Sequence, residues 1–95
     1  MTTRSQATKE KIIRKMKQHL SATFVNVIDE SWKHAGHAGA ASGGGHFILH
    51  LVSEKFEGVS LLNRNRMVFD LLKDEIQGEI HALAIQAKTP QESIN

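Results

Sequence analysis

The sequence predicts one small α+β domain with the element order α-β-β-α-β, in which a three-stranded mixed sheet carries its helices on one face. The chain has 95 residues, too few for two hydrophobic cores, and 40% of them are hydrophobic, as in ordinary globular domains. Hydrophobic spacing switches between the helical and the extended period along the chain. About 26 residues with a helical pattern separate the last two strands, the length of a right-handed crossover between parallel strands. We therefore treat residues 1–95 as a single domain and expect residues 1–4 and 91–95 to be frayed.

The first half of the chain contains a helix, a strand and a long polar segment. Apolar residues at helical spacing predict an amphipathic helix over residues 5–20: Ile12, Ile13, Met16 and Leu20. A β-branched run then predicts a strand over residues 24–30, which pairs antiparallel with the next strand. Residues 31–45 are polar and rich in glycine, and connections of that length are more often functional or mobile than incidental.

The second half contains two strands around a helix. Alternating residues predict a strand over residues 46–53, with Phe47, Leu49 and Leu51 on one face. Ser60 is a good N-cap for a helix that runs to Gln77. Its expected buried stripe is Leu61, Val68, Leu71, Leu72 and Ile76, and a third strand follows over residues 80–87.

Composition excludes several classes of function. The chain has no cysteine, so it forms no disulfide and no metal site built on its own thiolates, and any metal it holds must be bound by histidine. Its longest apolar stretches fall far short of a membrane-spanning helix. Residues 1–11 lack an apolar signal region and carry Glu10, which predicts a cytoplasmic protein. Residues 1–20 hold six basic side chains and one acidic one, which keeps DNA as a possible partner.

The six histidines form the most informative group. Parallel strands begin at the same end of a sheet, so we expect His46 and His81 at one edge, fed by the segment that carries His34 and His37. The candidate metal ligands are His34, His37 and His81, which this topology gathers at one edge of the sheet. Two imidazoles fill only part of a coordination shell and leave the rest to an outside molecule. His46 and His50 lie roughly 13 Å apart along one strand, too far to chelate one ion together.

Other features carry weaker hypotheses. His34, His37 and His81 supply three ligands for a metal-dependent hydrolase, but no carboxylate is placed to act as general base. Trp32, in the polar segment, is a candidate anchor for a partner protein. Residues 36–39 spell G-x-x-G, the nucleic-acid clamp of KH domains, although here the motif joins two strands instead of two helices. No nucleophile and base pair is recognisable, so we expect a protein without enzymatic activity.

Several motifs, in order and at matching spacings over residues 10–92, resemble the BolA family. They are Asp29-Glu30-Ser31-Trp32-Lys33-His34, His46-Phe47, Leu51-Val52-Ser53, Phe56-Glu57-Gly58, Leu62-Asn63-Arg64 with Arg66, Ile80-His81-Ala82-Leu83 and Thr89-Pro90. The resemblance implies a class II KH-like fold. It also implies pairing with a monothiol glutaredoxin that carries a CGFS motif, around a bridging [2Fe-2S] cluster.

In that family picture the glutaredoxin cysteine and a glutathione thiolate hold one side of the cluster, and the BolA protein contributes histidine. His81 matches the family's C-terminal histidine and His34 matches the loop histidine. The isolated chain is then expected to hold no cluster. Asn65 departs from the family pattern, which often has histidine there, and His37 leaves the identity of the loop ligand open. The resemblance implies a role in iron–sulfur trafficking or iron regulation, with transcriptional regulation through nucleic-acid binding as the alternative.

Overall fold

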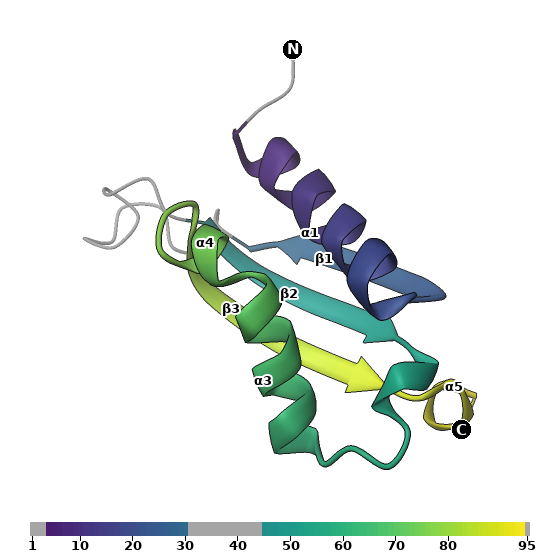
Figure 1. The fold of residues 1–95 in the computed structure, drawn as a ribbon. Coiled ribbons are helices and arrows are strands. Elements are labelled where there is room, and N and C mark those ends of the chain that lie inside the picture. Colours follow the sequence, from purple (N-terminus) through teal and green to yellow (C-terminus); the bar gives the residue numbers. More distant parts are fainter. Residues whose placement is uncertain (1–3, 31–44, 95) are drawn as a thin grey trace.

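The computed structural model describes residues 4–30 and 45–94, which form one three-stranded sheet with helices packed against it (Figure 1). In chain order the elements are α1 (Arg4–Leu20), β1 (Phe24–Asp29), β2 (Gly45–Val52), the short 3₁₀ helix η2 (Glu54–Phe56), α3 (Leu61–Leu71), α4 (Lys73–Ile76), β3 (Ile80–Lys88) and α5 (Pro90–Ser93). The predicted fold class and element order are confirmed, and α5 is an element that the sequence pattern did not predict.

The sheet has the strand order β1-β2-β3, with β2 in the centre. β1 pairs with β2 antiparallel and β2 pairs with β3 parallel. Both orientations are as predicted, because the β2–β3 connection contains α3 and is long enough to return the chain to the starting end of the sheet. β2 and β3 therefore begin at the same end.

The hydrophobic core lies between one face of the sheet and the helices α1 and α3, which cover that face (Figure 1). Alternate residues of β2 point into it, since Phe47, Leu49 and Leu51 are buried while His46, Ile48 and His50 between them are partly exposed. From the helices the core receives Ile12, Met16, Leu20, Val68 and Leu72. The alternate side chains of β2 that are not buried consequently lie on the opposite face of the sheet.

The helix predicted from Ser60 to Gln77 is divided in two. Ser60 caps it as predicted, since its hydroxyl accepts from the Asn63 N–H, but the helical conformation is interrupted at Leu72, where φ is −107° and ψ is 13°. The Leu72 N–H is shared between the carbonyls of Val68 and Phe69, which tightens the last turn of α3 before α4 begins. The hydrophobic period continues across this break, so the pattern alone does not reveal it.

Leu61 is not part of the buried stripe, contrary to the prediction. It is 69% exposed and borders an open hollow of about 370 Å³ between the start of α3 and β3. The first buried position of α3 is instead Arg64, whose guanidinium makes hydrogen bonds to backbone carbonyls and to a carboxylate beyond the end of β3. Arginine is rarely buried unless it is paired, so the hydrophobic pattern of the helix does not place Arg64 in the buried stripe.

Candidate functional site

The site candidate His81 lies at an irregularity at the start of β3. The parallel pairing matches Gly45 with Ile80 and then His46 with Ala82, so β3 carries one extra residue, His81, opposite a single step of β2. An extra residue of this kind is a β-bulge, and bulges often redirect a side chain beside a functional site. Ile80 is buried in the core, whereas His81 is exposed. The bulge therefore presents the imidazole outside the core.

His46, the second residue of β2, lies beside His81. The centres of the two imidazole rings are 5.0 Å apart, and the ring planes are tilted by 46°. The expectation that these two histidines meet at one edge is confirmed. Our sequence interpretation considered His46 as a ligand only together with His50 and did not count it as a partner of His81, although the parallel pairing already gave that signal.

Backbone hydrogen bonds join all three strands at this end of the sheet. The Gly45 N–H donates to the carbonyl of Glu79 at 2.9 Å, which ties the start of β2 to the residue before β3. The Glu30 N–H donates to the carbonyl of His46 at 2.8 Å, which ties β2 to the end of β1. His46 is thus fixed from both sides on the central strand.

Gly45 is required at its position by a close approach. A Cβ atom there would lie 2.4 Å from Cε2 of the Phe47 ring, far inside van der Waals contact. Phe47 itself is buried in the core. The glycine consequently lets β2 start directly above a core aromatic ring, next to the two histidines.

The candidates in the polar segment lie outside the described residues. This holds for His34 and His37, for Trp32 and for the G-x-x-G motif of residues 36–39. The residues that flank the segment, Glu30 and Gly45, are at the His46 end of the sheet, as the hydrogen bonds above show. The proposed roles of the loop histidines therefore stay predictions.

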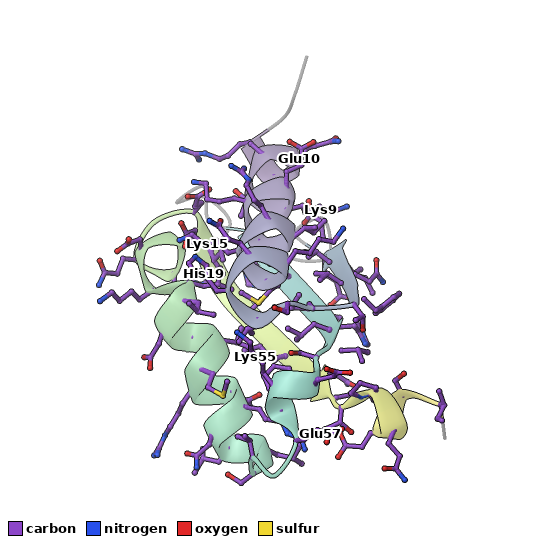
Figure 2. The ribbon with its side chains drawn as sticks, turned by 45° about the vertical axis from the view of Figure 1, so that its right-hand side comes forward. Lys9, Glu10, Lys15, His19, Lys55 and Glu57 are labelled. Atoms are coloured by element: carbon purple, nitrogen blue, oxygen red, sulfur yellow. The ribbon has the colours of Figure 1, made fainter. Side chains whose placement is uncertain are left out.

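The other described histidines are separate from the pair. His50 lies four residues further along β2, opposite Asn26 and Gln86, as expected for a strand residue that shares no ion with His46. His19 is exposed near the end of α1 (Figure 2), and its carbonyl accepts a hydrogen bond from Lys55 Nζ at 3.2 Å. Within residues 4–30 and 45–94, no group of three or more histidine, aspartate or glutamate side chains is arranged to hold a metal ion.

Part of the basic charge of α1 is used within the fold. Lys15 Nζ lies 2.8 Å from the carboxylate of the buried Glu75, and Lys11 Nζ lies 2.6 Å from that of Glu79. Figure 2 shows Lys15 on the side of α1 that faces α4, with Lys9 on the other side. The Glu79 carboxylate raises the pKa of Lys11, and the Lys11 ammonium lowers the pKa of Glu79. These two lysines hold α1 against α4 and the start of β3.

Comparisons with known proteins agree on one family. The family described as BolA-like protein matches residues 16–92. BolA-like protein 1 of Mus musculus is 46% identical over 76 residues, which cover 80% of this chain and 53% of that protein. The DNA-binding transcriptional regulator BolA of Escherichia coli (strain K12) is 38% identical over 84 residues, covering 88% of this chain and 77% of that protein.

The solved structures give the same result for the fold. The BolA domain of SufE1 from Arabidopsis thaliana matches with a TM-score of 0.79 at 42% identity, covering 90% of this chain and 95% of that one.

The chain spans 24% of the SufE-like protein 1 of Arabidopsis thaliana, whose name places it in chloroplasts or mitochondria. A cytoplasmic location accordingly stays a prediction. No helix in the described part of the chain is long and apolar enough to cross a membrane.

Proposed function

This chain belongs to the family of BolA-like proteins, and we propose that it acts as a non-enzymatic adaptor for iron–sulfur clusters. It pairs with a monothiol glutaredoxin that carries a CGFS motif, and the two proteins hold a [2Fe-2S] cluster between them as cargo. His81 supplies one ligand from this chain, and His34 or His37 of the polar segment supplies another. The cysteine of the glutaredoxin and a glutathione thiolate supply the remainder.

The observation that carries this proposal is the exposed imidazole of His81. His81 is the bulged residue of β3, and its side chain lies outside the core. The centre of the His46 ring lies 5.0 Å from the centre of its ring. The described residues provide no third ligand nearby, so this end of the sheet offers an incomplete set that a partner would complete. The donor chemistry suits iron, because histidine replaces cysteine on one iron of Rieske clusters and raises the reduction potential.

The absence of cysteine is compatible with this role. Each imidazole that replaces a thiolate removes one negative charge from the cluster site, so a mixed set is less negative than one made of four thiolates. All thiolates in the proposed complex come from the glutaredoxin and glutathione, because this chain has none. The proposal therefore requires the complex, and the chain alone forms no cluster.

The test is reconstitution of the complex. The chain, a CGFS glutaredoxin, glutathione, iron and sulfide are combined, and the visible absorption and circular dichroism spectra are recorded. We expect a spectrum that differs from that of the glutaredoxin homodimer, and we expect His81→Ala to lose it. His50→Ala is the control, since it removes another histidine of the same sheet that the proposal does not use as a ligand.

Two results would contradict the proposal. One is the absence of any mixed cluster spectrum with the wild-type chain. The other concerns the ligands alone: if His81→Ala and a His34→Ala/His37→Ala double variant both keep the wild-type spectrum, the assigned histidines do not bind the cluster. A pull-down with the tagged chain, probed for a small CGFS glutaredoxin, tests the pairing independently of the cluster.

A second candidate function is nucleic-acid binding, which the name of the Escherichia coli relative favours. Since Lys11 and Lys15 are paired with glutamates, the exposed cations of α1 that remain for phosphate contacts include Arg14 and Lys17. Duplex DNA binding that weakens steeply with salt and drops in Arg14→Gln/Lys17→Gln, but not in Lys73→Gln on α4, would support it. Lack of any binding at low salt would remove it.

A further inference from the structure

We infer that His46 and His81 together form a two-nitrogen site for a divalent transition-metal ion of the zinc or ferrous iron class. The inference rests on the proposed function only in its use of His81. For this single ion the second imidazole comes from a residue of β2, on the folded sheet, and not from the polar segment that the cluster proposal uses. His46 is therefore proposed here as a metal ligand.

The spacing of the rings is that of two histidines on one metal ion. A ring nitrogen binds zinc at about 2.1 Å, which places the centre of the ring about 3.2 Å from the ion. Two rings whose centres are 5.0 Å apart then subtend an angle of about 100° at the ion, close to the value of about 109° for tetrahedral coordination. The separation of the two ring centres is therefore the one that two histidines on a single metal ion require.

Both ligands are held by the sheet itself. His46 lies on the central strand, with its carbonyl bonded to Glu30 and its neighbour Gly45 bonded to Glu79. His81 is the bulged residue of the adjacent strand, immediately after the buried Ile80. A site whose ligands are fixed before the metal arrives loses less conformational entropy on binding than one formed by a flexible segment.

The site is open on the side of His81, whereas Nε2 of His46 is buried. Ala82, the partner of His46 in the β2–β3 register, carries only a methyl group, and His81 is exposed. Two imidazoles suit zinc, copper, nickel and iron, and they leave further positions to water or to ligands from another molecule. We therefore expect weak binding by the isolated chain and tighter binding when a second molecule adds its own donors.

The experiment is a zinc titration of the full chain in a His34→Ala/His37→Ala background, which removes the competing loop imidazoles. NMR spectra that correlate imidazole protons and nitrogens are recorded at each step. We expect the signals of His46 and His81 to shift together with one midpoint. Adding His46→Ala should raise the zinc dissociation constant by about tenfold or more, because losing a ligand costs at least as much as losing an outer-shell partner.

His50→Ala, added to the same background, is the matched control and should change the dissociation constant by less than about twofold. Two results overturn the inference: His81 shifts without His46, or His46→Ala binds zinc as tightly as its parent. Because the NMR measurement identifies the ligands directly in a chain that retains both histidines, a folding defect in His46→Ala would not obscure the result.

The same variants separate this inference from the proposed function. If cluster reconstitution with the glutaredoxin is lost in His81→Ala and kept in His46→Ala, and zinc does not move the His46 signals, the adaptor role stands and the two-histidine site fails. If zinc moves both imidazoles together but no mixed cluster forms with the wild-type chain, the two-histidine site stands and the adaptor role fails.

Discussion

The two ends of the parallel pair β2–β3 are built in opposite ways. At the end where β3 finishes, the buried Arg64 donates through Nε to the carbonyl of Val59, through Nη1 to that of Ala87, and through both Nη atoms to Glu92. At the end where both strands begin, the pairing is irregular and an imidazole stands exposed.

The difference separates stability from chemistry along one pair of strands. At the Arg64 end, Thr89 and Glu92 also form a capping box that starts α5, so charged and polar groups satisfy one another inside the chain. Groups already engaged in this way are poor ligands for another molecule. At the histidine end, backbone hydrogen bonds fix the starts of the strands, and the imidazole of His81 is exposed at the surface.

The largest effect on stability is expected at the Arg64 end. Arg64→Ala leaves the carbonyl of the largely buried Ala87 without its donor and removes a side chain that packs against Phe56, whose ring centre lies 5.9 Å from the guanidinium carbon. We expect a loss of about 3 kcal/mol in the free energy of unfolding, measured by urea denaturation. Arg66→Ala, at an exposed position of the same helix, should cost less than about 0.5 kcal/mol. Equal losses in the two variants would contradict the contrast between the ends.

The next effect tests whether the histidine end has a structural requirement of its own. Gly45→Ala forces a methyl group into the Phe47 ring, and we expect a loss of about 1–3 kcal/mol in urea denaturation. Gly78→Ala is the control, because a Cβ there meets nothing closer than the Asp74 carbonyl at 3.9 Å. If Gly45→Ala is as stable as Gly78→Ala, the start of β2 can shift without cost, and the geometry of the histidine pair is not fixed by the core.

A smaller effect should appear as a dependence on pH. The hydrogen bond from Arg64, aided by the backbone N–H of Thr89, lowers the pKa of Glu92 from 4.5 to about 2. A carboxyl group whose pKa is lowered by folding stabilises the native state fully above its unfolded value and loses that contribution as the pH falls towards the folded one. The difference in unfolding midpoint between wild type and Glu92→Gln should therefore be constant above about pH 5 and shrink between pH 4.5 and 2.

The two proteins should converge near the lower limit of that window, as measured by denaturation at a series of pH values. A difference that stays constant down to pH 2 would show that Glu92 does not stabilise the fold through its charge. Gln91→Glu is a matched control, since it adds a carboxylate at the neighbouring exposed position and should show no such convergence.

The smallest effect on stability belongs to His81. The residue is exposed and its side chain is outside the core, so His81→Ala should change the free energy of unfolding by less than about 0.5 kcal/mol while it abolishes the proposed cluster spectrum. A loss of more than about 1 kcal/mol in urea would assign His81 a structural role and remove the contrast between the two ends.

Much of the fold was predictable from the sequence because it depends on alternation and connection length. A connection that contains a helix predicts that β2 and β3 are parallel, and the structure confirms this orientation. The interruption at Leu72 was not predictable, because the hydrophobic period runs on through it. The burial of Arg64 depends on Glu92, far away in the sequence, and no local pattern contains that information.

The candidate site was predicted in part for the same reasons. Topology brought His46 and His81 to one edge, but the bulge that turns the His81 side chain beside His46 depends on local strand geometry that alternation does not encode. The roles of His34 and His37 rest on the predicted topology and on the family resemblance, and they await the double variant described above.

The bulge has a consequence for which residues this strand can accept at position 81. If position 81 is skipped, the inward and outward alternation of β3 runs without a fault from Ile80 through Ala82 and Leu83 to Ala87. The residue at 81 is thus an added member of the strand whose identity hydrophobic packing does not dictate. A substitution at position 81 can therefore change the atoms presented at this edge of the sheet without a change in the packing of the core.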